Sequence, residues 1–94
     1  MLETLTKEIW TDCLNEGFVI AGSIEMELVE VNSLGHKHPR AEREPFSLVF
    51  RGPKAPVLIQ KIYPVEHRRL GVLDIFLVPI GVDAEGMRYE AIFT

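Results

Sequence analysis

Hydrophobic and polar residues alternate along most of this chain, and the alternation predicts a small β-sheet. The last third contains three strand-like apolar runs, at 60–67, 72–80 and 87–93. The segments that join them, 68–71 and 81–86, contain glycine and polar residues, as hairpin turns do. This region therefore predicts three antiparallel strands in sequential order, a β-meander.

Two further strand regions precede the meander. The stretch 18–31 alternates between apolar residues and glutamates from Ile24 to Leu28, which is typical of a strand buried on one face. The apolar phase changes at Val29, so we expect a bulge or a strong bend there. The alternation resumes at 46–51 after a long polar segment.

The strand expected at 72–80 is apolar on both faces. Phe76 would lie on one face, and Ile75 and Leu77 on the other. A strand of this kind is normally covered on both sides. We therefore expect Phe76 to belong to the core, where its replacement by alanine would cost about 3–5 kcal/mol of stability.

Prolines and tyrosines mark special positions in the meander. Pro64 and Pro79 cannot donate to a strand ladder, so their strands are expected to be edges, or to be bulged or ended there. Tyr63 and Tyr89 are expected at the core or its edge, with each hydroxyl directed to a hydrogen-bond partner.

The N-terminal residues follow a helical period. Leu2, Leu5 and Ile9 recur at helical spacing, and Trp10 widens the apolar stripe. We expect one amphipathic helix over about residues 2–14 that lies across the sheet or plugs it, with Trp10 as a packing anchor.

Together these patterns predict a single domain over residues 1–94 of the α+β class. It would be a mostly antiparallel β-meander curled into a small barrel-like sheet, with one N-terminal amphipathic helix. Ninety-four residues are enough for one modest core. The polar segment 32–45 is expected to be a surface loop. Six or seven strands would leave an interior filled by side chains, because about eight are needed to hold a ligand.

Composition and charge narrow the classes of function. With 47% hydrophobic and 26% charged residues, the chain has the composition of an ordinary globular protein. A net charge of −4 gives no general attraction to nucleic acid or to an anionic membrane. The lone Cys13 excludes an intrachain disulfide and a multi-cysteine zinc site. We see no signal peptide and no apolar run of about 20 residues, so we expect a cytoplasmic protein.

Two histidines in the polar loop are candidate metal ligands. His36 and His38 could each offer a ring nitrogen to a metal ion. A third ligand would have to come from Glu42, Glu44 or a distant residue. A solvated, charged loop is the simpler interpretation of the same residues.

A second candidate is a basic patch that binds an anion or a carboxylate. Arginine side chains bind oxyanions with two parallel hydrogen bonds. In the alternative interpretation, the arginines pair with Glu66, Asp74 and Glu90 on neighbouring strands. The patch would consist of Arg51, His67, Arg69 and Arg88.

Several short segments of the second half of the chain carry a family resemblance. They are 46–53, Gln60, Tyr63, His67, 70–71, 76–81 and 86–93. These segments resemble a family of small, uncharacterised bacterial proteins, often encoded near phage-tail-collar-like proteins. The resemblance implies a structural or assembly role and no established activity.

The sequence therefore predicts a non-enzymatic protein-interaction or assembly module, related to phage tails, with no cofactor. Its partner would be another protein or a second copy of itself, with no binding to nucleic acid or membrane. An exposed edge of the C-terminal strand, 89–93, could receive that partner. The alternative is a small-molecule or metal-binding β-barrel that uses His36, His38 and His67. Convergent histidines and arginines around a pocket would favour this alternative, and a packed interior would favour the interaction module.

Overall fold

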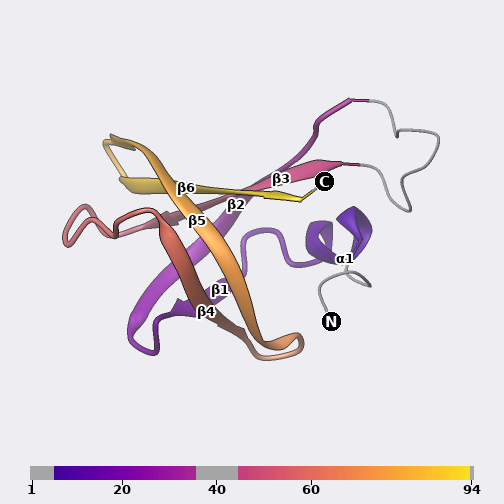
Figure 1. Ribbon diagram of the computed structural model, residues 1–94, viewed down its shortest axis with the longest axis horizontal. Coiled ribbons are helices and arrows are strands. Elements are labelled where there is room, and N and C mark those ends of the chain that lie inside the picture. Colours follow the sequence, from indigo (N-terminus) through magenta and orange to yellow (C-terminus); the bar gives the residue numbers. More distant parts are fainter. Residues whose placement is uncertain (1–5, 36–44, 94) are drawn as a thin grey trace.

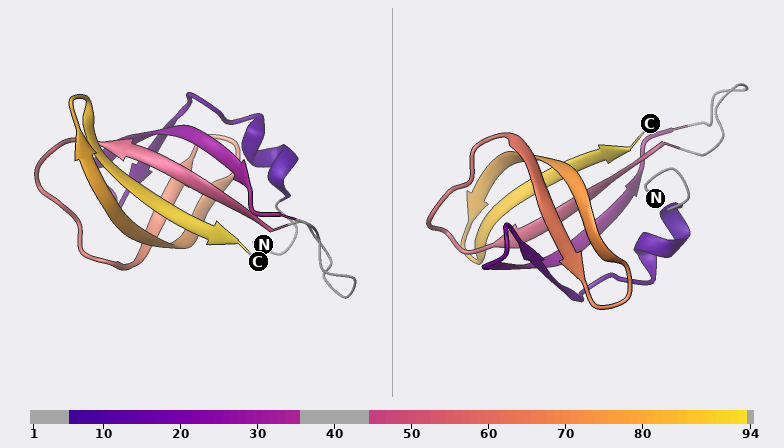
Figure 2. Two further views of the ribbon diagram at one scale, coloured as in Figure 1. Left: turned by 90° about the horizontal axis from the view of Figure 1, so that it is seen from above. Right: turned by 60° about the horizontal axis from the view of Figure 1, so that its bottom comes forward.

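The alternating segments form six antiparallel strands that close into a barrel (Figures 1 and 2). This computed structural model describes residues 6–35 and 45–93. The order of strands around the barrel is β1-β2-β3-β6-β5-β4, and β4 pairs back onto β1. The elements are α1 (Lys7–Thr11), β1 (Gly17–Ile20), β2 (Ile24–Ser33), β3 (Phe46–Gly52), β4 (Lys61–His67), β5 (Gly71–Asp83) and β6 (Gly86–Phe93).

The described part of the chain is all-β, so the prediction of an α+β fold with an amphipathic helix was wrong. The helix α1 has five residues, and the first residues of the predicted helix lie outside the described ones. The chain leaves the helix because its backbone bonds to β2 instead: Asn15 N donates to Leu28 O, and Leu28 N donates to Glu16 O. Asn15 adopts a left-handed conformation, with φ of 68°, which a helix does not continue. No helix within 6–35 or 45–93 is long and apolar enough to cross a membrane.

Although short, α1 closes one end of the barrel through Trp10 (Figure 2). The Trp10 side chain is fully buried. Its ring lies 6.0 Å from that of Phe18 and 5.8 Å from that of Phe93. Trp10 is thus the packing anchor that the helical spacing predicts.

Inward-facing side chains of all six strands fill the barrel. The aromatic rings pack closely; for example, Phe18 meets Phe50 edge to face at 5.2 Å. The buried apolar cluster consists of Trp10, Cys13, Phe18, Ile20, Met26, Leu28, Phe46, Leu48, Phe50, Tyr63, Val65, Ile75, Leu77, Met87, Tyr89, Ala91 and Phe93.

Two irregularities bend the strands toward closure. The register of β2 against β3 shifts between Leu28 and Glu30, next to the position where the change of apolar phase predicts a bend. The register of β5 against β6 shifts between Pro79 and Gly81. Proline has no N–H to donate, so a bulge is a suitable place for it.

The long connection 53–60 leads from β3 to β4, which lie on opposite sides of the barrel. Two tyrosine hydroxyls hold it. Leu58 N donates to Tyr89 Oη at 2.8 Å, and Tyr63 Oη donates to Ile59 O at 2.7 Å. The expectation that both hydroxyls find partners is confirmed.

Closure gives the C-terminal strand a neighbour on each side. The strand β6 pairs with β3 over Met87–Phe93 but with β5 only over Gly86–Glu90, so the expected edge at 89–93 is paired with β5 at Tyr89 and Glu90. The shortest seam joins β1 to β4, with only Val19↔Glu66 and Ile20↔Val65 in register. Ala21 N adds one hydrogen bond to Pro64 O at the end of this seam.

Phe76 lies on the outside of the barrel, so its expected burial was wrong. Its side chain is 48% exposed, whereas Ile75 and Leu77 on either side of it are buried. On β5 the side chains that face the barrel interior are buried, and the helix covers an end of the barrel rather than the outside of β5 (Figure 2). The apolar residues on the inner face of β5 are therefore buried in the core, whereas those on its outer face are exposed to solvent.

Two phenylalanine variants test this assignment. Phe50→Ala should lower the free energy of unfolding by about 3–5 kcal/mol, because it removes a fully buried ring. Phe76→Ala should lower it by less than about 1 kcal/mol, because that ring faces solvent. Urea unfolding followed by circular dichroism measures both. Similar losses for the two variants would contradict the orientation of β5.

Candidate functional site

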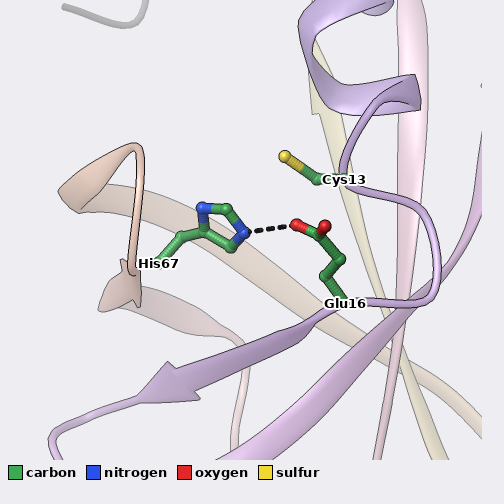
Figure 3. Close-up of side chains that lie close together, drawn as sticks. All are labelled: Cys13, Glu16 and His67. Atoms are coloured by element: carbon green, nitrogen blue, oxygen red, sulfur yellow. Dashed lines mark hydrogen bonds and ion pairs between the residues drawn. The ribbon is translucent and has the colours of Figure 1, made fainter.

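A buried histidine, His67, stands at the end of β4 (Figure 3). Its side chain is only 1% exposed, and its ring packs against Phe18 at 4.6 Å. Its Nε2 atom lies 2.8 Å from Oε1 of Glu16, a residue 51 positions earlier in the chain. The thiol of Cys13 lies beside this pair.

The turn after β4 brings two arginines to the same carboxylate. Arg69 donates from Nη2 to Glu16 Oε1 at 2.9 Å and also contacts Cys13 Sγ at 3.5 Å. Arg68 Nη2 lies 3.5 Å from Glu16 Oε2. Glu16 thus accepts hydrogen bonds from the imidazole of His67 and the guanidinium of Arg69, and it forms an ion pair with Arg68. We call Cys13, Glu16, His67, Arg68 and Arg69 the Glu16–His67 cluster.

The backbone assigns the protonation of His67. Its Nδ1 atom accepts from the backbone N–H groups of Arg69 at 3.2 Å and Leu70 at 3.3 Å. Since Nδ1 is an acceptor, the ring proton is on Nε2, which donates to Glu16. Both ring nitrogens therefore have partners when the imidazole is neutral.

This tautomer does not suit a metal centre. The ligand atoms of Cys13, Glu16 and His67 lie within 4.8 Å of one another, a suitable spacing for an ion. However, a histidine that binds a metal through Nε2 normally donates its Nδ1–H to an acceptor. Here two N–H donors face Nδ1, and the Arg69 guanidinium adds positive charge beside the other two ligands.

The same geometry argues against a cysteine nucleophile. A histidine that activates Cys13 would have to accept the thiol proton at a free Nε2. In this arrangement Nε2 already carries a proton and donates it to Glu16. The Glu16–His67 cluster is thus suited to hold the segment before β1 against the end of β4, rather than to perform acid–base chemistry.

The electrostatics of Glu16 agree with that structural role. The hydrogen bond from His67 lowers the pKa of the Glu16 carboxyl below its ordinary value, and the charges of Arg69 and Arg68 lower it further. Partial desolvation opposes the shift without reversing it. The cluster therefore favours the ionised carboxylate.

Arg51 and Arg88 form a separate ion-pair network on the outside of the barrel. They are direct neighbours across β3 and β6. Arg51 contacts Glu27 at 3.3 Å and Glu85 at 3.1 Å. Arg88 contacts Glu30 at 3.0 Å and Asp83 at 2.9 Å. Each guanidinium is thus occupied by two carboxylates of the chain itself.

A hollow of about 800 Å³ lies beside Arg51, next to the turn between β1 and β2. Its charged lining consists of Arg51 and the three glutamates Glu25, Glu27 and Glu85. The surplus of carboxylates makes this hollow unsuitable for an anion.

The candidate residues from the sequence therefore lie in different places. His67 and Arg69 meet in the Glu16–His67 cluster, and Arg51 and Arg88 meet in the outer network. The partners of Arg51 and Arg88 are not the carboxylates that the alternative interpretation names. His36 and His38 lie outside the described residues.

Sequence reasoning missed Glu16, the acceptor at the centre of the cluster. Glu16 belongs to no motif, and its partners are more than 50 positions away, at 67–69. Only the pairing of β1 with β4 brings them together.

Exposed apolar side chains on β4 and β5 form a third feature of the barrel. Ile62 and Phe76 are cross-strand neighbours, and they are 58% and 48% exposed. Further exposed apolar residues recur at every fourth position along β5, up to its register shift. We define the apolar face as Ile62, Val72, Phe76 and Ile80.

Comparison with known proteins identifies a family without a known activity. A family model described as a domain of unknown function (DUF6916) matches residues 5–93. The comparisons with curated proteins and with solved structures give no match.

The lowered pKa of Glu16 predicts a pH-dependent stability. Since the folded pKa lies below the ordinary value of 4.5, the contribution is fully present above that value. It is lost as the pH falls through the folded pKa. Glu16→Gln should be less stable than the wild type at about pH 7 and should lose less stability on acidification to about pH 3.

Urea unfolding at several pH values measures this effect. Glu25→Gln is the matched control, because Glu25 is exposed and forms no ion pair within the described chain. Identical pH profiles for Glu16→Gln and the wild type would contradict the role of the cluster.

The assigned tautomer of His67 can be observed directly. Long-range ¹H–¹⁵N NMR spectra, recorded with the His67 imidazole in its neutral form, should show a protonated Nε2 and an unprotonated Nδ1 for this residue. Addition of Zn²⁺ should leave these two signals unchanged, because Nδ1 faces two donors. A Zn²⁺-dependent shift of the His67 Nε2 signal would contradict our conclusion that the cluster does not suit a metal.

Proposed function

We propose that this chain, which belongs to the DUF6916 family of domains of unknown function, is a non-enzymatic protein-interaction module of a larger assembly. One observation carries the proposal: the apolar face, on the outside of β4 and β5, is exposed to solvent. Monomeric proteins rarely expose large contiguous apolar patches, and such patches commonly mark sites where another protein binds.

The energetics of the apolar face favour a partner. Each Å² of apolar surface removed from water contributes roughly 25 cal/mol to association, before the costs of binding. Ile62 and Phe76 lie side by side on adjacent strands, so one partner segment could cover both. Phenylalanine in particular is enriched at protein interfaces.

The polar clusters support the same proposal by their internal pairing. The guanidinium groups of Arg51, Arg69 and Arg88 bind carboxylates of the chain itself. His67 has hydrogen-bond partners at both ring nitrogens. Substrate chemistry would require such groups to be available. The small-molecule or metal-binding alternative would depend on His36 and His38, which lie outside the described residues.

The finer part of the proposal concerns the kind of assembly. We place it among bacterial, phage-tail-related assemblies, and we place the protein in the cytoplasm. The support is the resemblance of residues 46–93 to small bacterial proteins often encoded beside phage-tail-collar-like proteins. The strands β4 and β5, which carry the apolar face, fall within these residues.

A quantitative pull-down tests the proposal. The tagged wild-type chain should capture a stoichiometric protein partner from lysate of its native cells, identified by mass spectrometry. Phe76→Ser should lose at least about 90% of that capture, because loss of a central aromatic contact costs about 2 kcal/mol or more.

Leu34→Ser is the matched control for this experiment. Leu34 is 46% exposed, close to the value for Phe76, but it follows β2, on the opposite side of the barrel from β5. Leu34→Ser should therefore keep the partner. Equal capture by Phe76→Ser and Leu34→Ser, with both variants folded, would show that the apolar face is not the binding surface.

A further inference from the structure

Three carboxylates border the apolar face. Asp74 lies on the outer side of β5 between Val72 and Phe76. Glu66 is the cross-strand neighbour of Val72 on β4, and Glu90 on β6 is the neighbour of Val78. The exposed apolar residues therefore stand beside acidic groups on three adjacent strands.

Within 6–35 and 45–93, these three carboxylates form no ion pair. The ion pairs of the described chain use five other carboxylates: Glu16, Glu27, Glu30, Asp83 and Glu85. The arginines of the described residues are thus paired in the Glu16–His67 cluster and the Arg51–Arg88 network, while the border of the apolar face keeps its negative charge.

From this juxtaposition we infer that the occupant of the apolar face is a basic amphipathic segment of a partner protein. The inference rests on the proposed function and specifies its partner. Apolar side chains of the segment cover Ile62 and Phe76. Lysine or arginine side chains beside them meet Glu66, Asp74 and Glu90, so that charges of opposite sign face each other across the interface.

The same charges disfavour the other possible occupants. A second copy of the chain, packed face to face, would bring the carboxylates Glu66, Asp74 and Glu90 of both copies into one interface, and like charges in an interface are costly. An anionic lipid surface would be repelled for the same reason. A cationic apolar segment matches both the apolar centre and the acidic border.

Two synthetic peptides test the inference on the full chain. Both have the same pattern of leucines, and their polar positions are all lysine in one and all glutamate in the other. In ¹⁵N–¹H NMR titrations the lysine peptide should bind saturably and shift the amide signals of Ile62 and Phe76. The glutamate peptide should leave these signals unchanged.

Charge reversal provides the decisive variants. The double variant Asp74→Lys, Glu90→Lys should weaken binding of the lysine peptide about five-fold to ten-fold, as expected for one exposed and one half-buried charge at the surface. Glu25→Lys is the control, because Glu25 is an exposed carboxylate on β2, which lies on the opposite side of the barrel from β5. It should leave the affinity unchanged.

The outcomes separate this inference from the proposed function. Equal binding of both peptides, or an unchanged affinity of the double variant, overturns the basic segment. If the basic segment is overturned but Phe76→Ser loses the partner in the pull-down, the proposed interaction module stands and only the inference about its partner fails. If Phe76→Ser keeps the partner, the proposed function and the inference both fail. A dimer in light scattering that disappears in Phe76→Ser overturns the basic segment in favour of a second copy.

Discussion

The closure of the barrel between β1 and β4 is the constraint on which the rest of the structure depends. Only two residue pairs join these strands, and the last of them is Val19↔Glu66. Beyond that pair, the side chains of Glu16 and His67 make the connection, from the residue before β1 to the last residue of β4. A buried, charge-assisted hydrogen bond thus continues a short backbone ladder, which explains why a histidine is placed inside an apolar core.

Closure determines what the outside of the barrel can do. Every strand has a hydrogen-bonded neighbour on each side in the described part, although β5 pairs with β6 only over Val78–Asp83. In our proposal the partner binds to the surface of the sheet. The outer surface of β5 is apolar at Phe76, and no other segment within 6–35 or 45–93 buries that side chain. The interaction surface that we propose therefore depends on the same closure that Glu16 and His67 support.

Much of the fold could be predicted because strand signals are local. The alternation at 46–51 and the turn residues at 68–71 identify strands and hairpins without any knowledge of their neighbours. Phe76 could not be placed, because a strand that is apolar on both faces does not reveal which face a barrel buries. Glu16 could not be identified as a partner of His67, because their contact depends on a pairing across 51 positions.

The outside of this barrel has two kinds of charged surface, one where charges are paired within the chain and one where they are not. Where arginines and carboxylates meet, as at Arg88 with Glu30 and Asp83, the attraction is satisfied within the chain and contributes to the fold. At Asp74 the chain supplies no cation within its described residues, and the nearest outward neighbours are apolar. A negative charge left beside exposed phenylalanine is free to attract a cation from outside the molecule, and our proposal places the partner at this surface because of that physical asymmetry.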